Sequence, residues 1–149
     1  MKKLIANLIA IYQAAVTAGR VKLGSVRKGI SPDPEKLISM GEYPFIAFDD
    51  GGQSVEEVKS DQAQRRVFTV IIEIGVYSPN LEQALDDVLD LFDACKAELE
   101  LEENRPLLYD SHIWAINVTT FAWGTVPKFF RGMQIMCRFY DLEPRFSDY

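Results

Sequence analysis

The sequence predicts an α+β protein with a mostly antiparallel sheet of about four to five strands. Apolar residues recur every three or four positions near the N-terminus and again at 81–99, which is typical of amphipathic helices. Other segments alternate apolar and polar residues, as half-buried strands do. Most of these strands follow one another without a helix between them. We therefore expect antiparallel pairing, with the N-terminal helix and a long acidic helix packed on one face.

The first element is an amphipathic helix at the N-terminus. Two lysines before an apolar stretch are also typical of a signal peptide, but Asn7, Tyr12 and Gln13 interrupt this stretch. Gly19 is expected to end the helix, because glycine adopts the left-handed conformation of helix ends. The predicted apolar face comprises Leu4, Ile5, Leu8, Ile9, Ile11, Tyr12, Ala15 and Val16.

A short strand, a turn and a second strand are expected next. Residues 21–28 have a strand pattern, and "SPDPEK" at 31–36 predicts a turn, because each proline biases the preceding residue away from helix. "YPFIAF" at 43–48 reads as a strand. Pro44 has no N–H to donate, so it belongs at the start of that strand or at a sheet edge.

Residues 49–66 are polar, with a glycine pair near their start. Compact domains seldom keep such a long connection without a use for it, so we expect an extended loop or a protruding hairpin. The clearest strand follows at 67–77. It points five apolar side chains to one side, which predicts a central strand: Phe68, Val70, Ile72, Ile74 and Val76.

The corner "YSPN" leads from this strand into the acidic helix. Ser78 can cap the helix, and Asn80 with Gln83 is an alternative capping pair. The helix has an apolar stripe of Leu81, Ala84, Leu85, Val88, Leu91, Phe92, Cys95 and Leu99. Its opposite face, for which we expect solvent exposure, carries Glu82, Asp86, Asp87, Asp90, Asp93 and Glu98.

Two further strands are predicted at 113–121 and 133–140, joined by a turn within "AWGTVPKFFRG". Residues 141–149 are expected to form a flexible tail. No repeat, low-complexity tract or linker divides the chain, so residues 1–149 are predicted to form a single domain.

Charge and composition limit the classes of function. The formal net charge is −6. Residues 1–48 carry seven basic and three acidic groups, whereas residues 80–103 carry nine acidic groups and one lysine. An acidic chain lacks the basic surface of a nucleic-acid binder. No apolar run approaches the ~18 residues of a membrane span. Cys95 and Cys137 lie in apolar patterns, which predicts buried free thiols and a reducing compartment.

The sequence offers little catalytic chemistry, so we expect no enzyme and no cofactor. His112 is the only histidine, and one histidine with two distant cysteines cannot form a typical zinc site. "DDGG" at 49–52 lacks the ligand spacing of a calcium loop and reads as a turn. An alternative is a small metal-dependent hydrolase that uses Asp49, Asp50 and the helix carboxylates.

Charged and aromatic residues flank the two longest connections, and their composition is that of a protein interface. The alternative is that the aromatic residues merely close the end of the sheet. The candidate interface residues are Asp49, Asp50, Arg65, Arg66, Trp123, Lys128, Phe129 and Arg131.

The order of elements resembles a known group of proteins. An N-terminal amphipathic helix precedes the strand "YPFIAF", and a polar excursion leads to "RRVFTVIIEIGVYSPNLEQALDDVLDLFDACKAEL". The last strand begins within "FFRGMQIMCRFY". This pattern is similar to that of the tail terminator, or tail completion, proteins of long-tailed bacteriophages, which include the lambda-type minor tail protein U. The resemblance covers nearly the whole chain and rests on pattern, not on an invariant motif.

The resemblance implies a structural protein with no catalytic residues. It would form a homohexameric ring that caps the finished tail tube and joins it to the head connector. DNA would pass through this ring without specific binding, and an acidic passage would favour such sliding. The protein would be made in the cytoplasm of the bacterial host and reside in the virion. Another head–tail adaptor or neck protein is the alternative within the same class.

Overall fold

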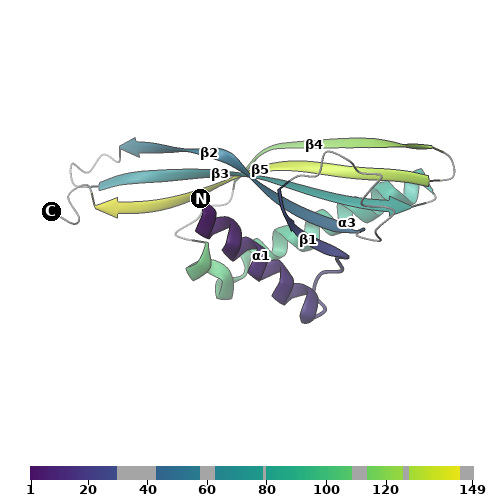
Figure 1. Ribbon diagram of the computed structural model, residues 1–149, viewed down its shortest axis with the longest axis horizontal. Helices are drawn as coiled ribbons and strands as arrows, with labels where there is room; N and C mark the ends of the chain where they lie inside the picture. The colour runs from purple at the N-terminus through teal and green to yellow at the C-terminus, as the bar shows by residue number, and fades with distance from the viewer. Residues whose placement is uncertain (30–42, 58–62, 79, 109–113, 126–127, 145–149) are drawn as a thin grey trace.

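The computed structural model describes residues 1–29, 43–57, 63–78, 80–108, 114–125 and 128–144. The protein has two layers: a five-stranded sheet, and two long helices packed on one of its faces (Figure 1). This arrangement confirms the predicted α+β class. The elements are α1 (Lys2–Thr17), β1 (Ser25–Lys28), β2 (Phe45–Glu57), β3 (Ala63–Ser78), α3 (Leu81–Glu100), the 3-10 helix η1 (Glu102–Leu107), β4 (Trp114–Thr125) and β5 (Lys128–Pro144).

The strand order across the sheet is β1-β2-β3-β5-β4. Strand β1 is parallel to β2, and every other neighbouring pair is antiparallel. Strand β3 is central, as its five inward apolar residues predicted. Two borders follow from this order. Strand β4 forms one alongside Lys128–Arg138 of β5, and the short β1 forms the other alongside Phe45–Phe48 of β2.

Helix α1 ends in a glycine turn. Gly19 has a φ of +78°, a left-handed conformation that favours glycine. The N–H groups of Gly19 and Arg20 donate to the carbonyls of Val16 and Ala15, at 3.1 and 3.0 Å. These two bonds form a Schellman motif, which satisfies carbonyls that the helix itself leaves free. The predicted end of the helix is confirmed, and the turn directs Arg20 back toward α3.

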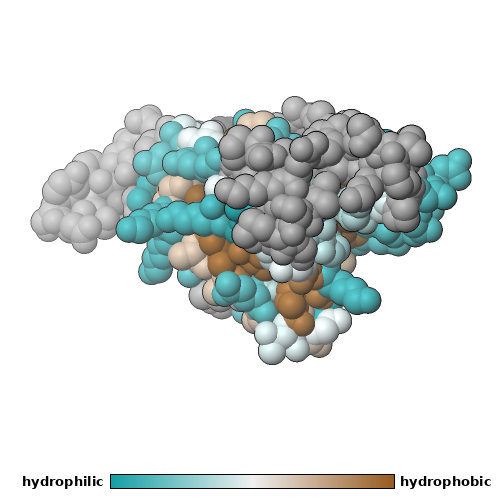
Figure 2. All heavy atoms as spheres, turned by 45° about the vertical axis from the view of Figure 1, so that its right-hand side comes forward, coloured by the Kyte–Doolittle hydropathy of each residue, from teal (hydrophilic) through white to brown (hydrophobic). Residues whose placement is uncertain are grey.

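The core lies between the helices and the sheet. Helix α1 contacts β1 and β2, and α3 contacts β3 and β5. The five predicted inward residues of β3 are all buried in this core. On the face shown in Figure 2, hydrophobic residues lie recessed in the middle, with hydrophilic residues around them. Its largest fully buried side chains include Tyr12, Phe48 and Phe139.

Several predicted bounds differ from the structure. Of the strand predicted at 21–28, only Ser25–Lys28 is strand, and the loop or hairpin predicted at 49–66 is a hairpin. Strands β2 and β3 continue through most of the predicted loop 49–66, leaving 58–62 outside the described residues. The predicted connection at 122–132 is mainly strand, with only 126–127 outside the described part of β4 and β5. Strand β5 continues to Pro144, where we expected a tail from 141. In the last three cases strand pairing continues into residues whose own sequence pattern did not indicate a strand.

Some expectations concern residues that the structure does not describe. They are the turn at 31–36, His112, and the remainder of the tail at 145–149. Pro44 directly precedes β2, as its missing N–H predicted. At the corner, Asn80 and not Ser78 caps the helix. The side chain of Gln83, the predicted capping partner of Asn80, bonds to Asp87 instead. Asn80 Oδ1 accepts from the N–H groups of Glu82 and Gln83, and Ser78 Oγ accepts from the N–H of Asn80.

Candidate interaction surfaces

A three-stranded arm extends from the sheet beyond the helices (Figure 1). We define the arm as residues 53–57 of β2, 63–68 of β3 and 139–144 of β5. The register places Ala63 opposite Pro144 and Glu57 opposite Gln64, so all three strands run to its tip. The predicted protruding hairpin is therefore part of the sheet, and its third strand comes from the segment expected to be a tail.

A β-bulge separates the arm from the rest of β2. The register with β3 shifts between Asp50 and Gln53. Gly52 has a φ of +104°, and a Cβ on Gly51 would lie 2.8 Å from the carbonyl oxygen of Thr69. Both positions therefore require glycine. "DDGG" forms this bulge, where we expected a turn, and bulges increase the local twist of the strand.

The two aspartates of the bulge bond to the local backbone. Asp49 Oδ1 accepts from the N–H of Asp50 at 2.8 Å, and Asp50 Oδ1 accepts from the N–H of Gly52 at 2.7 Å. These bonds hold the bulge in shape. Among the described residues, no three His, Cys, Asp or Glu side chains come together in a group that could hold a metal ion.

Arg65 and Arg66 lie within the arm and not beside a loop. By register, Arg65 is opposite Glu56 on β2, and Arg66 is opposite Asp141 on β5. The Arg66 guanidinium also lies over the ring of Phe68, with Cζ 5.5 Å from the ring centroid.

The second group of candidate residues lies in the β4–β5 hairpin, at the other end of the sheet (Figure 1). Trp123 is opposite Phe130, and Lys128 is opposite Thr125 next to the connection. Phe129 lies between Gly124 and Ser78, so it borders the corner that leads into α3. Arg131 lies between Ala122 and Val76. Its Nε is buried and has no hydrogen-bond partner among the described residues.

The eight candidate residues therefore fall into two groups, one at each end of the strands. Asp49, Asp50, Arg65 and Arg66 lie at or near the arm, whereas Trp123, Lys128, Phe129 and Arg131 lie in the hairpin. Sequence reasoning did not show this separation, because strand register decides which end of a sheet a residue occupies. A protein with one contact surface at each end can engage two partners, or two copies of itself, at once.

A groove of about 570 Å³ lies between α3 and the start of β2, and no sequence pattern predicted it. Two aspartates of α3 line one wall, and two basic residues that follow α1 line another. Tyr43 and Tyr77 are also in the lining, and burial raises the pKa of Tyr43 above its ordinary value. The lining comprises Arg20, Val21, Lys22, Tyr43, Pro44, Val76, Tyr77, Asp87, Asp90, Leu91 and Ala94.

Glu98 differs from the other acidic residues of α3. Its side chain is only 4% exposed, whereas we expected it on the solvated face. Arg20 Nε donates to Glu98 Oε1 at 2.7 Å, and this bond raises the pKa of Arg20. The pair joins the end of α1 to the end of α3. Glu82, Asp86, Asp90 and Asp93 are exposed, as the helical pattern predicted.

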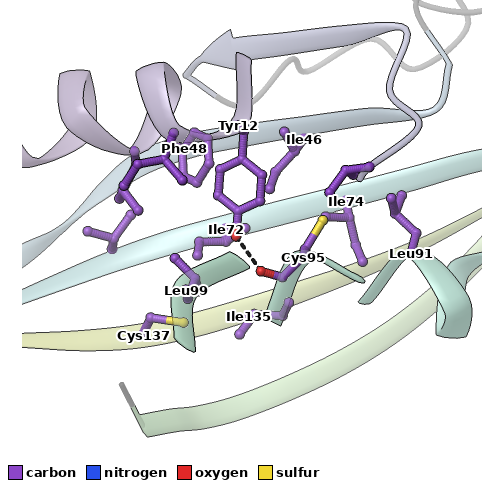
Figure 3. Packing of buried hydrophobic residues seen from close by; sticks show 14 of the residues in the cluster. Tyr12, Ile46, Phe48, Ile72, Ile74, Leu91, Cys95, Leu99, Ile135 and Cys137 are labelled. Atoms are coloured by element: carbon purple, nitrogen blue, oxygen red, sulfur yellow. Dashed lines mark hydrogen bonds between the residues drawn. The ribbon is translucent and has the colours of Figure 1, made fainter. Parts of the chain in front are cut away.

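The two cysteines are buried and free, as predicted. Burial raises the pKa of each thiol to about 12, which keeps both protonated at neutral pH. Both line a cavity of about 40 Å³ between α3 and the sheet, together with Ile72 and Ile135 (Figure 3). Such thiols pack as small apolar groups and are poor nucleophiles.

One carboxyl group lies on the sheet face opposite the helices. Glu73 is in the middle of β3 and only 8% exposed. Its register neighbours are Ala47 and Gln134. Burial raises the pKa of Glu73, and a hydrogen bond with the Gln134 side chain partly opposes this shift. Glu73 alternates with the inward residues Ile72 and Ile74, which places it on this second face.

No helix in the described part of the chain is long and apolar enough to cross a membrane. No protein-family model matches the sequence, and no curated protein matches it. Among solved structures, the chain is similar to one chain of the virion of a native gene transfer agent (GTA) particle. That match has 12% identity and a TM-score of 0.35, and covers 87% of this chain and 91% of the other. A TM-score of 0.35 is too low to carry an argument about fold or function.

Proposed function

We propose that the protein is a non-enzymatic structural component of a phage virion, and that its copies assemble into a ring. The ring would cap the tail tube and join it to the head connector. The observation that carries this proposal is the separation of two contact surfaces, the arm and the β4–β5 hairpin, at opposite ends of one sheet. A subunit that offers different surfaces on different sides can repeat head to tail, and a head-to-tail interface that closes makes a ring.

The chemistry of the described residues is consistent with a binding role. The two thiols are buried and protonated, and the bulge carboxylates bond to their own backbone. The long strands of the arm leave polar backbone groups at its borders, and such groups recognise other strands. In the proposed mechanism, one ring face binds the end of the tube and blocks further tube subunits. The other face receives the connector.

Native mass spectrometry tests the proposed ring. The expected result is a species of six 16.9-kDa chains, either alone or after addition of tail tube protein. Negative-stain images of the same sample should show rings at tube ends. A chain that stays monomeric with both tube protein and connector would contradict the proposal. Capping of the connector alone, with no binding to tubes, would instead favour another head–tail adaptor.

The metal-dependent hydrolase alternative has its own test. A metal ion that binds only the folded state raises the melting temperature in a saturable way. We expect Mg²⁺, Mn²⁺ and Ca²⁺ to leave the melting temperature unchanged within about one degree. A large, saturable rise that Asp50→Asn abolishes would revive the hydrolase.

A further inference from the structure

Strand β4 is an unusual edge strand. It forms one border of the sheet, and no described strand pairs with its outer side. Its twelve residues, "WAINVTTFAWGT", contain no charged residue and no proline. Natural proteins usually protect a long edge with charges, prolines or bulges, because its free N–H and C=O groups can pair with any other strand. A register shift between Ala115 and Asn117 interrupts β4 once, which leaves residues 117–125 as a regular, unprotected edge.

The chain itself contains a second open edge. Strand β1 covers β2 only at Phe45–Phe48. Beyond that point, no described strand pairs with the outer side of β2 along 49–57, although the N–H groups of Asp50 and Gly52 already donate to aspartate side chains of the bulge. This edge lies on the opposite border of the sheet from β4. The outer side of β5 along 139–144 also has no described partner strand, on the same border as β4. Open edges on opposite borders allow copies of one chain to add to each other in a single direction.

The charges of the two regions are complementary. Residues 114–138, which include β4 and the part of β5 beside it, carry Lys128, Arg131 and Arg138 and no acidic residue. Residues 49–57 carry four carboxylates and no basic residue, and the arm with its bulge carries six acidic and two basic residues in total. Pairing β4 with a second β4 would bring two cationic hairpins together. Pairing it with the β2 edge of another copy brings opposite charges together.

The strand directions also fit this pairing. Each of the pairs β2–β3, β3–β5 and β5–β4 is antiparallel, so β4 runs opposite to β2 within one chain. When a neighbouring copy has nearly the same orientation, its β2 meets β4 in an antiparallel pair, the more stable kind. Phe121, the midpoint of the open β4 edge, aligns through Gly132 of β5 with Gly75 of β3. Gln53, the midpoint of the β2 edge, aligns with Phe68 of β3, seven residues away from Gly75. The copies must therefore shift by about seven residues, or ~23 Å, along the strands. Closed barrels use such a stagger.

We propose that the β4 edge of one subunit pairs with the open β2 edge, residues 49–57, of the next, so that one continuous sheet joins the copies. This inference rests on the proposed self-assembly and specifies its contact. The hairpin and the arm are then the two halves of one interface. The uncharged edge is kept open because a second copy covers it.

Proline substitutions can block one edge at a time. Successive N–H groups of a strand point to opposite sides. Of the two variants Thr119→Pro and Thr120→Pro, one therefore loses an N–H that points away from β5, at the open edge. The other removes a bond to β5 and is the matched control that lowers the melting temperature. The same reasoning applies to Gln53→Pro and Ser54→Pro on β2. From each pair, the variant with the native melting temperature is the edge-blocked protein.

The test mixes the two edge-blocked proteins and measures mass by native mass spectrometry. Each blocked protein retains the open edge that the other lacks, and both keep the outer side of β5 at 139–144 without a described partner strand. We expect each to be monomeric alone and a 1:1 mixture to form heterodimers that grow no further, with at least a tenfold loss of self-association for each alone. Raising the salt concentration should weaken the heterodimer. A β2-blocked protein that dimerises alone would show β4–β4 pairing and overturn the proposal.

Failure of this inference can be told from failure of the proposed ring. If the wild-type protein and both blocked proteins all form hexamers, the ring stands and the strand pairing is wrong. If the wild type forms open filaments and the mixture stops at heterodimers, the pairing stands and the closed ring is wrong. If no sample associates, even as a mixture, the pairing is also wrong.

Discussion

The phenol of Tyr12 donates a hydrogen bond of 2.6 Å to the backbone carbonyl oxygen of Cys95, although 83 residues separate them in the chain (Figure 3). The ring of Tyr12 is fully buried and lies 5.5 Å from that of Phe48, measured between centroids. One side chain of α1 therefore contacts both α3 and the sheet. The hydrogen bond gives the buried hydroxyl of Tyr12 an acceptor inside the core. Burial raises the pKa of this hydroxyl well above its ordinary value.

Replacing Tyr12 with Phe tests that hydrogen bond. The substitution keeps the ring and removes the donor, so the free energy of unfolding should fall by about 0.5–1.5 kcal/mol. Tyr12→Ala is the comparison and should cost about 3–5 kcal/mol, because it also leaves a cavity. Urea unfolding followed by circular dichroism measures both changes. Equal stability of Tyr12→Phe and the wild type would show that the bond adds nothing.

The Arg20–Glu98 pair should stabilise the join between α1 and α3. Arg20→Met leaves the nearly buried Glu98 carboxylate without this partner and should lower the melting temperature. The double variant Arg20→Met with Glu98→Leu removes both charges and should recover part of the loss. A thermal double-mutant cycle measures the coupling. Lys96→Met is the control, because the exposed Lys96–Glu100 pair, at 3.9 Å, should contribute little.

Glu73→Gln should stabilise the protein more at neutral pH than at acid pH. Burial raises the pKa of Glu73 in the folded state, so its contribution is fully favourable below the ordinary carboxyl pKa. That contribution is lost as the pH rises through the raised pKa, because the buried group then ionises. Gln stays neutral and can still hydrogen-bond to Gln134.

The measurement is the difference in melting temperature between Glu73→Gln and the wild type at pH 4 and pH 7. The difference should be larger at pH 7. Asp86→Asn, on the exposed face of α3, is the matched control. A Glu73→Gln protein that is less stable than the wild type at pH 7 would show that the ionised carboxylate is stabilising.

The buried thiols should react slowly. Both Cys95 and Cys137 have a pKa of about 12, so almost no thiolate exists at pH 8 and reagents have little access. Ellman's reagent should release less than a tenth of the expected colour from native protein within minutes. In guanidinium chloride it should titrate two thiols per chain. Rapid reaction of both thiols in the folded protein is the contrary outcome.

Shortening the arm should prevent assembly without preventing folding. Replacing residues 55–66 by Asn-Gly joins Ser54 to Val67, which face each other in the register, through a favoured hairpin turn. Among residues with described side chains, the core cluster on these strands ends at Phe48 and Phe68. The shortened protein should therefore melt within a few degrees of the wild type but no longer form rings or join heads to tails.

A control variant keeps the full arm and carries Glu57→Gln at its tip. It should assemble nearly as the wild type does, because it retains the backbone edge. If the shortened protein still completes tails, the arm is not a contact surface and the proposed strand pairing loses one of its two edges.

The sequence by itself determined the elements of the core. Periods of 3.6 and 2 residues are imposed by the backbone, so apolar spacing identified α1, α3 and β3 and the buried face of each. Local chemistry also gave Ser78 and Asn80 as candidate caps at the "YSPN" corner and the left-handed turn at Gly19. These features depend on residues a few positions apart, which a sequence displays directly.

Only the tertiary structure decided the extent of the polar strands and the positions of the candidate surfaces. Residues 139–144 become the third strand of the arm because β3 provides a partner, not because of their own pattern. Glu98 is buried because Arg20, 78 residues away, reaches it. The same holds for the open β4 edge. Which strand lies at a border, and which residues face each other across a sheet, depends on long-range pairing, and no local periodicity contains that information.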